Sequence, residues 1–201
     1  KKNSNSKLEE SIDISLRINL KQSKGGDLSL RKVVKLPNGS GKKVKIAVLC
    51  EQDKIDEAKK SGADLFGSDD LIEKIAAGKF NFTKLICTPG MMGKIGKHGK
   101  VLGPKGLMPN PKSGTVTNDV GQAVQNLKAG QVELRVESTG IIHVSCGKTS
   151  FENQQINENI LSIYNAIQKA RPSSVKGEYL LKISMSSTMG PAIIIDRQTI
   201  R

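Results

Sequence analysis

The first clear pattern in the chain is a strict alternation of apolar and polar residues over positions 12–20. Every second residue there is Ile or Leu, and the residues between them are Asp13, Ser15, Arg17 and Asn19. Because successive side chains of a strand point to opposite faces, this spacing predicts a half-buried strand with one wet face. On spacing alone, an ordinary solvated face is the simpler interpretation and a binding face is the alternative.

The pattern changes after a second predicted strand at 31–36 and a Pro-Asn-Gly-Ser-Gly turn signal at 37–41. From position 43, short apolar strands alternate with amphipathic helices, which predicts a small α/β domain with a parallel sheet. The predicted strands are at 43–50 and 84–87, and the predicted helices are at 53–61, at 69–77 and up to 129. Gly62 follows the end of the first helix, and Ser68 is the expected N-cap of the second. Either Thr117 or Asn118 is the expected N-cap of the third helix, and Gly130 follows its end.

Beyond position 130 the pattern returns to strands. It predicts a hairpin of strands at 131–137 and 140–145, an amphipathic helix at 153–170, strands at 179–185 and 192–196, and a hydroxyl-rich connection at 184–191. Two N-terminal strands cannot hold a core alone, so we expect them to pair with the C-terminal strands under the long helix. The predicted fold class is therefore α/β in two domains: an α+β outer domain, 1–41 and 131–201, and an inserted α/β domain, 42–130. The Gly-containing crossings near 40–43 and 130–133 are candidate hinges.

Residues 94–120 form the least ordinary stretch of the chain, KIGKHGKVLGPKGLMPNPKSGTVTNDV. It overlaps positions 74–118, which hold eight lysines and no Asp or Glu. Frequent Gly and Pro exclude a long helix, and the apolar residues between them exclude a disordered tail. We expect an ordered loop that presents lysines and backbone N–H groups to phosphate. Its Gly96-Lys97-His98-Gly99 tetrad resembles the loop with which KH domains clamp a nucleic-acid backbone, and a plain Gly-rich turn is the alternative.

The charge of the whole chain points to the same class of partner. Its net charge is +13 and its pI is about 9.7, which is typical of proteins that bind nucleic acid or an anionic membrane. No apolar run approaches the roughly 20 residues of a membrane span, so we expect no membrane partner. The chain has four Phe, two Tyr and no Trp, which argues against base stacking and favours recognition of structured RNA by shape.

Other chemistries find little support. The chain has only two histidines, His98 and His143, and no nucleophile motif, so we expect no enzyme. Cys50, Cys87 and Cys146 lack the paired spacing of a metal site and are expected to be buried, reduced thiols of an intracellular protein. The NGSGKK run at 38–43 fails the phosphate-binding P-loop pattern. No cofactor is expected.

Several longer motifs resemble one known family. GKVLGPKGLMPNPKSGTVTNDV at 99–120, SMSSTMGP at 184–191 and ELRVESTGIIHVSCGKTSF at 133–151 are similar to universal large-subunit ribosomal protein one, the protein of the mobile lateral stalk. The resemblance implies a discontinuous outer domain with an inserted Rossmann-like domain, and no cofactor. It also implies binding to the stalk helices of large-subunit rRNA and movement that helps deacylated tRNA leave the E site. In bacterial members the same surface can repress translation of the protein's own mRNA.

Matched residue by residue, the resemblance puts the main rRNA contacts on the outer domain. They are Ser11, Asp13, Ser15, Arg17, Lys148, Ser187, Thr188, Met189 and Gly190. Secondary contacts to tRNA or other rRNA are expected at Lys94, Lys97, Lys100 and Lys105. Short hydroxyls suit the 2′-hydroxyls of a shallow minor groove, and an acid there accepts from a 2′-hydroxyl or a base amino group.

The chain departs from the bacterial pattern in one region. Positions 21–27 read KQSKGGD, and Arg31 precedes Lys32, where bacterial members carry an Asp-Pro-Arg-type segment and an Arg-Gly. The expected location is the ribosome of either a bacterial cytoplasm or an organelle matrix, mitochondrial or plastid, and the departure weakens the expectation of mRNA repression. The alternative function is a free RNA-binding regulator that uses the GxxG tetrad as a KH-like clamp.

Overall fold

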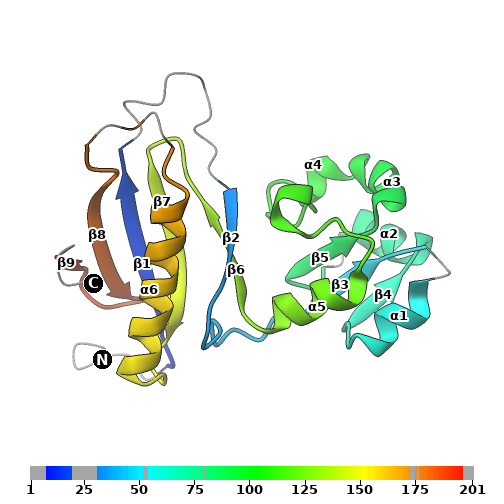
Figure 1. The fold of residues 1–201 in the computed structure, drawn as a ribbon. Helices are drawn as coiled ribbons and strands as arrows, with labels where there is room; N and C mark the ends of the chain where they lie inside the picture. Colours follow the sequence, from blue (N-terminus) through cyan, green and yellow to red (C-terminus); the bar gives the residue numbers. More distant parts are fainter. Residues whose placement is uncertain are drawn as a thin grey trace. The chain divides into compact units, whose positions relative to one another are not determined.

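A computed structural model describes residues 8–19, 31–51, 54–78, 80–172, 175 and 177–196 (Figure 1). The chain divides into two compact units: an outer unit, Lys1–Lys42 with Gly130–Arg201, and an inserted unit, Lys43–Ala129. The outer unit mixes an antiparallel sheet with one long helix, and the inserted unit has a parallel sheet with helices, which confirms the predicted fold class. Positions 21–27, where the sequence departs from the bacterial pattern, lie outside the described residues.

The outer unit is built on a four-stranded antiparallel sheet with strand order β7-β1-β8-β9. Its strands are β1 (Ser11–Ile18), β7 (Ile141–Lys148), β8 (Leu180–Ser187) and β9 (Ile193–Ile195). Because β1 lies between β7 and β8, the N-terminal strand pairs with C-terminal segments as the sequence predicts. The connection expected at 184–191 is shorter than predicted, since β8 continues through Ser187.

The long helix α6 (Asn153–Lys169) covers one face of this sheet (Figure 1). Its start is fixed by a capping box in which the side chains of Glu152 and Gln155 each accept a hydrogen bond from the other residue's backbone N–H. Its apolar stripe shares one core with the apolar side chains of β1, and the helix residues buried there are Ile156, Ile160, Ile163 and Ile167. The helix predicted at 153–170 is therefore confirmed.

Two further strands, β2 (Arg31–Lys35) and β6 (Gln131–Arg135), pair as an antiparallel ribbon in the same unit. The chain then turns from β6 into β7 through the predicted hairpin, where a bridge pairs Val136 with Ile142. Buried Leu134 and Val136 join the core under α6. The ribbon therefore shares its core with the four-stranded sheet.

The segment that follows β2 is fixed to the middle of α6 by the buried side chain of Asn159. Its Oδ1 accepts from the Asn38 N–H at 3.2 Å, and its Nδ2 donates to the carbonyl oxygens of Gly39 at 3.0 Å and Cys146 at 2.8 Å. Where the chain returns, Gly130 has a φ of +91°, and a Cβ there would overlap the Cα of Gly39. The turn at 37–41, which leads into the candidate hinge near 40–43, is thus anchored to the outer unit as far as Gly39.

The inserted unit is a three-stranded parallel sheet with β3 between β4 (Leu65–Gly67) and β5, and it has apolar clusters on both faces. In β3 (Ile46–Leu49) alternate side chains face α2 (Asp69–Ala76) on one side and both α1 (Ile55–Lys60) and α5 (Val120–Lys128) on the other. Burial on both faces explains why β3 is an unbroken apolar run, as in Rossmann-like sheets. The strand β5 (Lys84–Cys87) has the predicted bounds.

Three details of this unit differ from the sequence predictions. The edge strand β4 (Leu65–Gly67) was not predicted, because it is only three residues long and its Phe66 is 39% exposed. Ser68 occupies the N-cap of α2 without a side-chain capping bond. The N-cap of α5 is Asp119, and Thr117 Oγ1 instead accepts from the Asp119 N–H at 3.1 Å.

The basic Gly-rich stretch folds into short helical turns, so the expectation of a loop was wrong in part. These turns are η2 (Pro89–Met91), α3 (Met92–Gly96), α4 (Gly99–Leu102) and η3 (Pro111–Ser113). Buried Met91, Ile95 and Leu102, four and seven positions apart, give the stretch one apolar side that packs on the sheet. Gly and Pro keep each helix short without preventing helical geometry.

The three cysteines are buried free thiols, as predicted. Burial raises the pKa of Cys87 to about 11 and that of Cys146 to about 12, so both thiols stay protonated near neutral pH. In the described ranges, every helix falls short of the length and apolar character that crossing a bilayer requires.

Candidate nucleic-acid interface

The outer sheet has one face turned away from α6, which we call the open face. In β1 the residues on this face are Ser11, Asp13, Ser15 and Arg17, because the apolar residues between them are buried against α6. Asp13 and Arg17 are exposed and the two serines are half-buried. The strand with one wet face is therefore confirmed, and four predicted contact residues share that face.

The strand register brings further polar residues onto the open face that the sequence did not single out. Asp13 lies opposite Ser186 of β8 and Ser145 of β7. Similarly, Ser15 lies between Ser184 and His143, and Arg17 lies between Lys182 and Ile141. Alternation along β7 and β8 indicates which residues of each strand share a face, but only the pairing with β1 shows that these faces form one surface.

Two hydroxyls on the open face have distinctive surroundings. Ser15 Oγ lies 2.9 Å from His143 Nδ1 across β1 and β7. Ser145 Oγ is buried and has no hydrogen-bond partner within the described structure. A buried hydroxyl without a partner is unfavourable, so Ser145 is a local cost to the stability of the sheet.

The turn after β8 is tied to the start of β1. The Thr188 N–H donates to the Ser11 carbonyl oxygen at 3.2 Å, and Thr188 Oγ1 accepts from the Ser11 N–H at 3.2 Å. Met189 is 80% exposed, and the Gly190 N–H closes the turn on the Ser187 carbonyl oxygen at 3.3 Å. Thr188 thus fixes the turn, while Met189 presents an apolar side chain to solvent.

Two further predicted contact residues, Ser187 and Lys148, differ from the four on β1 in their position or their contacts. Ser187 lies opposite buried Ile12, which puts it on the face of the sheet that bears α6. Lys148 lies opposite Ser11, and its Nζ donates to Glu9 Oε2 at 2.7 Å. Hydrogen bonds from Lys148 and then Ser150 lower the pKa of the Glu9 carboxyl below its ordinary value. The charge of Lys148 is therefore paired with the Glu9 carboxylate in this structure.

The four lysines expected to make secondary contacts lie in the inserted unit and fall into two pairs. Lys94 Nζ lies 2.7 Å from Asp69 Oδ1, and Lys105 Nζ lies 3.8 Å from the centre of the Phe80 ring. Lys97 and Lys100 are exposed, and neither forms an ion pair with any residue that the structure describes. Of the four lysines, these two have neither an ion pair nor an aromatic contact among the described residues.

The GxxG tetrad forms the turn between α3 and α4. A Cβ at Gly96 or Gly99 would meet no atom within 4 Å, and neither glycine has a positive φ. Neither packing nor backbone strain within the inserted unit therefore requires glycine at these two positions. This is compatible with close approach of a ligand to the backbone, as the KH-like alternative requires.

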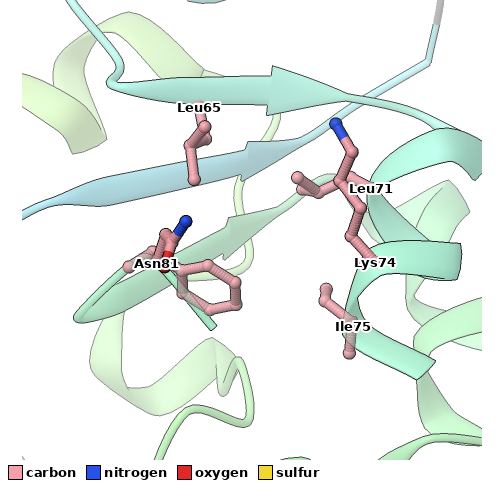
Figure 2. Close-up of a pocket in the computed structure, with 6 residues that line it drawn as sticks. Leu65, Leu71, Lys74, Ile75 and Asn81 are labelled. Carbon is pink, nitrogen blue, oxygen red and sulfur yellow. The ribbon is translucent and has the colours of Figure 1, made fainter. Parts of the chain in front are cut away.

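A pocket of about 280 Å³ lies elsewhere in the inserted unit, beside β4 and α2 (Figure 2). Its wall is apolar except for Lys74 and Asn81, and the other lining residues are Leu65, Leu71, Ile75 and Phe82. None of the predicted contact residues lines it. Among the described residues, no three His, Cys, Asp or Glu side chains gather into a possible metal site.

A basic chain whose sheet presents hydroxyls, an imidazole and two cations on one open face has the chemistry that is typical of RNA-binding proteins. The family model of the ribosomal protein L1p/L10e family matches residues 1–191. The chain therefore belongs to this family of structural RNA-binding proteins, which are not enzymes.

Bacterial relatives are similar over nearly the whole chain. "Large ribosomal subunit protein uL1" of Coxiella burnetii (strain RSA 493 / Nine Mile phase I) is 50% identical over 194 residues, which cover 96% of this chain and 83% of that protein. The protein of the same name from Pelagibacter ubique (strain HTCC1062) is 52% identical over 191 residues, covering 94% and 83%.

Proposed function

We propose that this chain is a structural constituent of the large ribosomal subunit and binds the stalk helices of large-subunit rRNA through the open face and the 188–190 turn. Relatives of about 50% identity that carry the name of a large-subunit protein support the first part. The observation that carries the second is the hydrogen bonding between Ser11 and Thr188, which joins two candidate contact segments 177 positions apart.

The chemistry of the open face suits the minor groove of an RNA helix. Its serines are short donors and acceptors that can reach 2′-hydroxyls. Asp13 is repelled by phosphate, so it accepts from a 2′-hydroxyl or a base amino group. Exposed Met189 offers an apolar contact to a ribose or base.

The inserted unit supplies the second part of the proposal. Lys97 and Lys100 contact the phosphates of E-site tRNA or of neighbouring rRNA, with Lys94 and Lys105 contributing charge nearby. Movement of this unit with the stalk would assist release of deacylated tRNA. Repression of the chain's own mRNA would follow if that mRNA presents the same helix geometry to the open face.

The alternative, a free regulator with a KH-like clamp, is favoured by the open surroundings of Gly96 and Gly99. The two functions predict opposite results for two double variants. Under the ribosomal proposal, Thr188→Val with Met189→Ala abolishes the preference for a stalk-helix rRNA fragment over a scrambled hairpin, and Lys97→Gln with Lys100→Gln leaves it intact. The reverse result would support the regulator, and circular dichroism of each variant checks that it is folded.

A further inference from the structure

Two cations oppose each other directly on the open face. Arg17 of β1 and Lys182 of β8 are register partners, and both are exposed. Side chains paired in this way have Cβ atoms about 4.5–5.5 Å apart, and like charges at that spacing destabilise a sheet. Neither side chain forms an ion pair with any described residue.

The surroundings offset this repulsion only in part. On the other side of Arg17, the partner in β7 is the apolar Ile141. Asp13 is the carboxylate on β1, and four residues along a strand separate it from Arg17 by about 13 Å. Asp196 lies one residue beyond Ile195, the register partner of Ile183, so the β8–β9 pairing brings one carboxylate toward Lys182 and leaves the two cations in excess.

A bulge lies immediately beside the pair. The register of β1 and β8 shifts between Arg17 and Ile18, because Ile18 pairs with Leu180 and the intervening Leu181 is left over. Bulges increase the local twist and re-aim neighbouring side chains, and they are frequent beside functional sites. An unfavourable pair of side chains and an irregular strand pairing therefore occur at the same place in the sheet.

We propose that Arg17 and Lys182 together bind a single phosphate of the RNA backbone at this end of the open face. The proposal rests on the RNA-binding function proposed above and adds a residue, Lys182, and the chemical class of its ligand, a phosphodiester. The guanidinium donates two parallel N–H bonds to phosphate oxygens, and the ammonium adds a third donor and a second charge. Between them, the bound phosphate replaces repulsion with two attractions.

The test uses Arg17→Gln, Lys182→Gln and the double variant, with Lys35→Gln as the control. Lys35 is an exposed lysine of β2 whose register partner is the uncharged Gln131. Without RNA, either Gln variant should raise the melting temperature, because it removes the repulsion. With the stalk-helix fragment, each should weaken binding about tenfold and lower the slope of log K against log salt by about 0.7–0.9. Lys35→Gln should do neither.

The double variant distinguishes one shared phosphate from two separate ones. If both residues hold the same phosphate, the double variant should bind little more weakly than either single variant. Additive losses with a slope change near 1.4–1.8, unchanged affinity or a lower melting temperature of the single variants would each overturn the proposal. Failure of the proposed function would look different: the wild-type protein would then bind the stalk fragment and a scrambled hairpin equally, whatever the variants do.

Discussion

Ser11 and Thr188, which are 177 positions apart in the sequence, are joined by backbone and side-chain hydrogen bonds of 3.2–3.3 Å. The Thr188 hydroxyl both accepts from the Ser11 N–H and donates to the Ser11 carbonyl oxygen. It thereby holds the exposed turn after β8 against the first residue of β1. The two candidate contact segments form one surface because of these bonds.

Replacing Thr188 with Val keeps the side-chain shape and removes its hydroxyl. We expect the free energy of unfolding to fall by about 1 kcal/mol, because exposed hydrogen bonds contribute modestly. We expect affinity for the stalk-helix fragment to fall by about tenfold or more, because the turn is no longer fixed. Urea unfolding and a binding titration measure the two effects. Thr188→Ser, which retains the hydroxyl, should behave as wild type in both, and a Val variant that binds normally would contradict this account.

Asn159→Ala should be among the most damaging single changes in the outer unit. It leaves three backbone groups, on Asn38, Gly39 and Cys146, without their hydrogen-bond partner at a fully buried site. We expect a loss of about 3 kcal/mol in the free energy of unfolding. Asn157→Ala, at an exposed position of α6, is the matched control and should change stability by less than about 0.5 kcal/mol. Equal stabilities of the two variants would show that Asn159 does not anchor the crossing.

A pair of glycine substitutions separates backbone strain from steric overlap. Gly78 and Gly130 both have a positive φ, of +75° and +91°, but a Cβ has free space at Gly78 and overlaps Gly39 at Gly130. Gly78→Ala should therefore cost about 1 kcal/mol, the strain alone. Gly130→Ala should cost at least about 2 kcal/mol more, because the two crossing segments must move apart. Thermal unfolding of both variants measures the difference, and similar losses would mean that the close approach is unimportant.

The ion pair of Glu9 and Lys148 makes stability depend on pH in a defined window. Its hydrogen bonds lower the pKa of Glu9 from 4.5, so the folded carboxylate holds its proton less tightly than the unfolded one. The stabilisation is therefore fully present above about pH 4.5 and is lost as the pH falls through the folded pKa. Carboxyl NMR titration of Lys148→Met should show the Glu9 pKa rising toward its ordinary value; an unchanged pKa would rule out the pair.

The sequence predicted the parts of this structure that depend on local periodicity. The alternation in β1 and the apolar stripe of α6 each identify an element and its buried face without any knowledge of partners. Even the return of the N-terminal strand to the C-terminal sheet follows from the need to cover its apolar face. By contrast, β4 was missed because a three-residue strand has too few positions to show a period.

The site was predicted less completely, because its composition depends on pairing between distant strands. Lys182, Ser184 and His143 join the open face only through their register with β1, which no local pattern contains. Likewise, Asn159 looks like an interruption of the apolar stripe until the backbone groups of Asn38 and Gly39 are placed beside it. In each case, tertiary contacts assign the role of a polar residue.

The most direct test of the central claim is the salt dependence of binding to a stalk-helix rRNA fragment, measured beside a scrambled hairpin of equal length. Phosphate contacts weaken together with rising salt on any RNA, whereas contacts to 2′-hydroxyls and base edges do not. The open face predicts a preference for the stalk fragment that persists as salt rises. Equal affinities that fall in parallel would contradict it and leave a basic protein that binds RNA by charge alone.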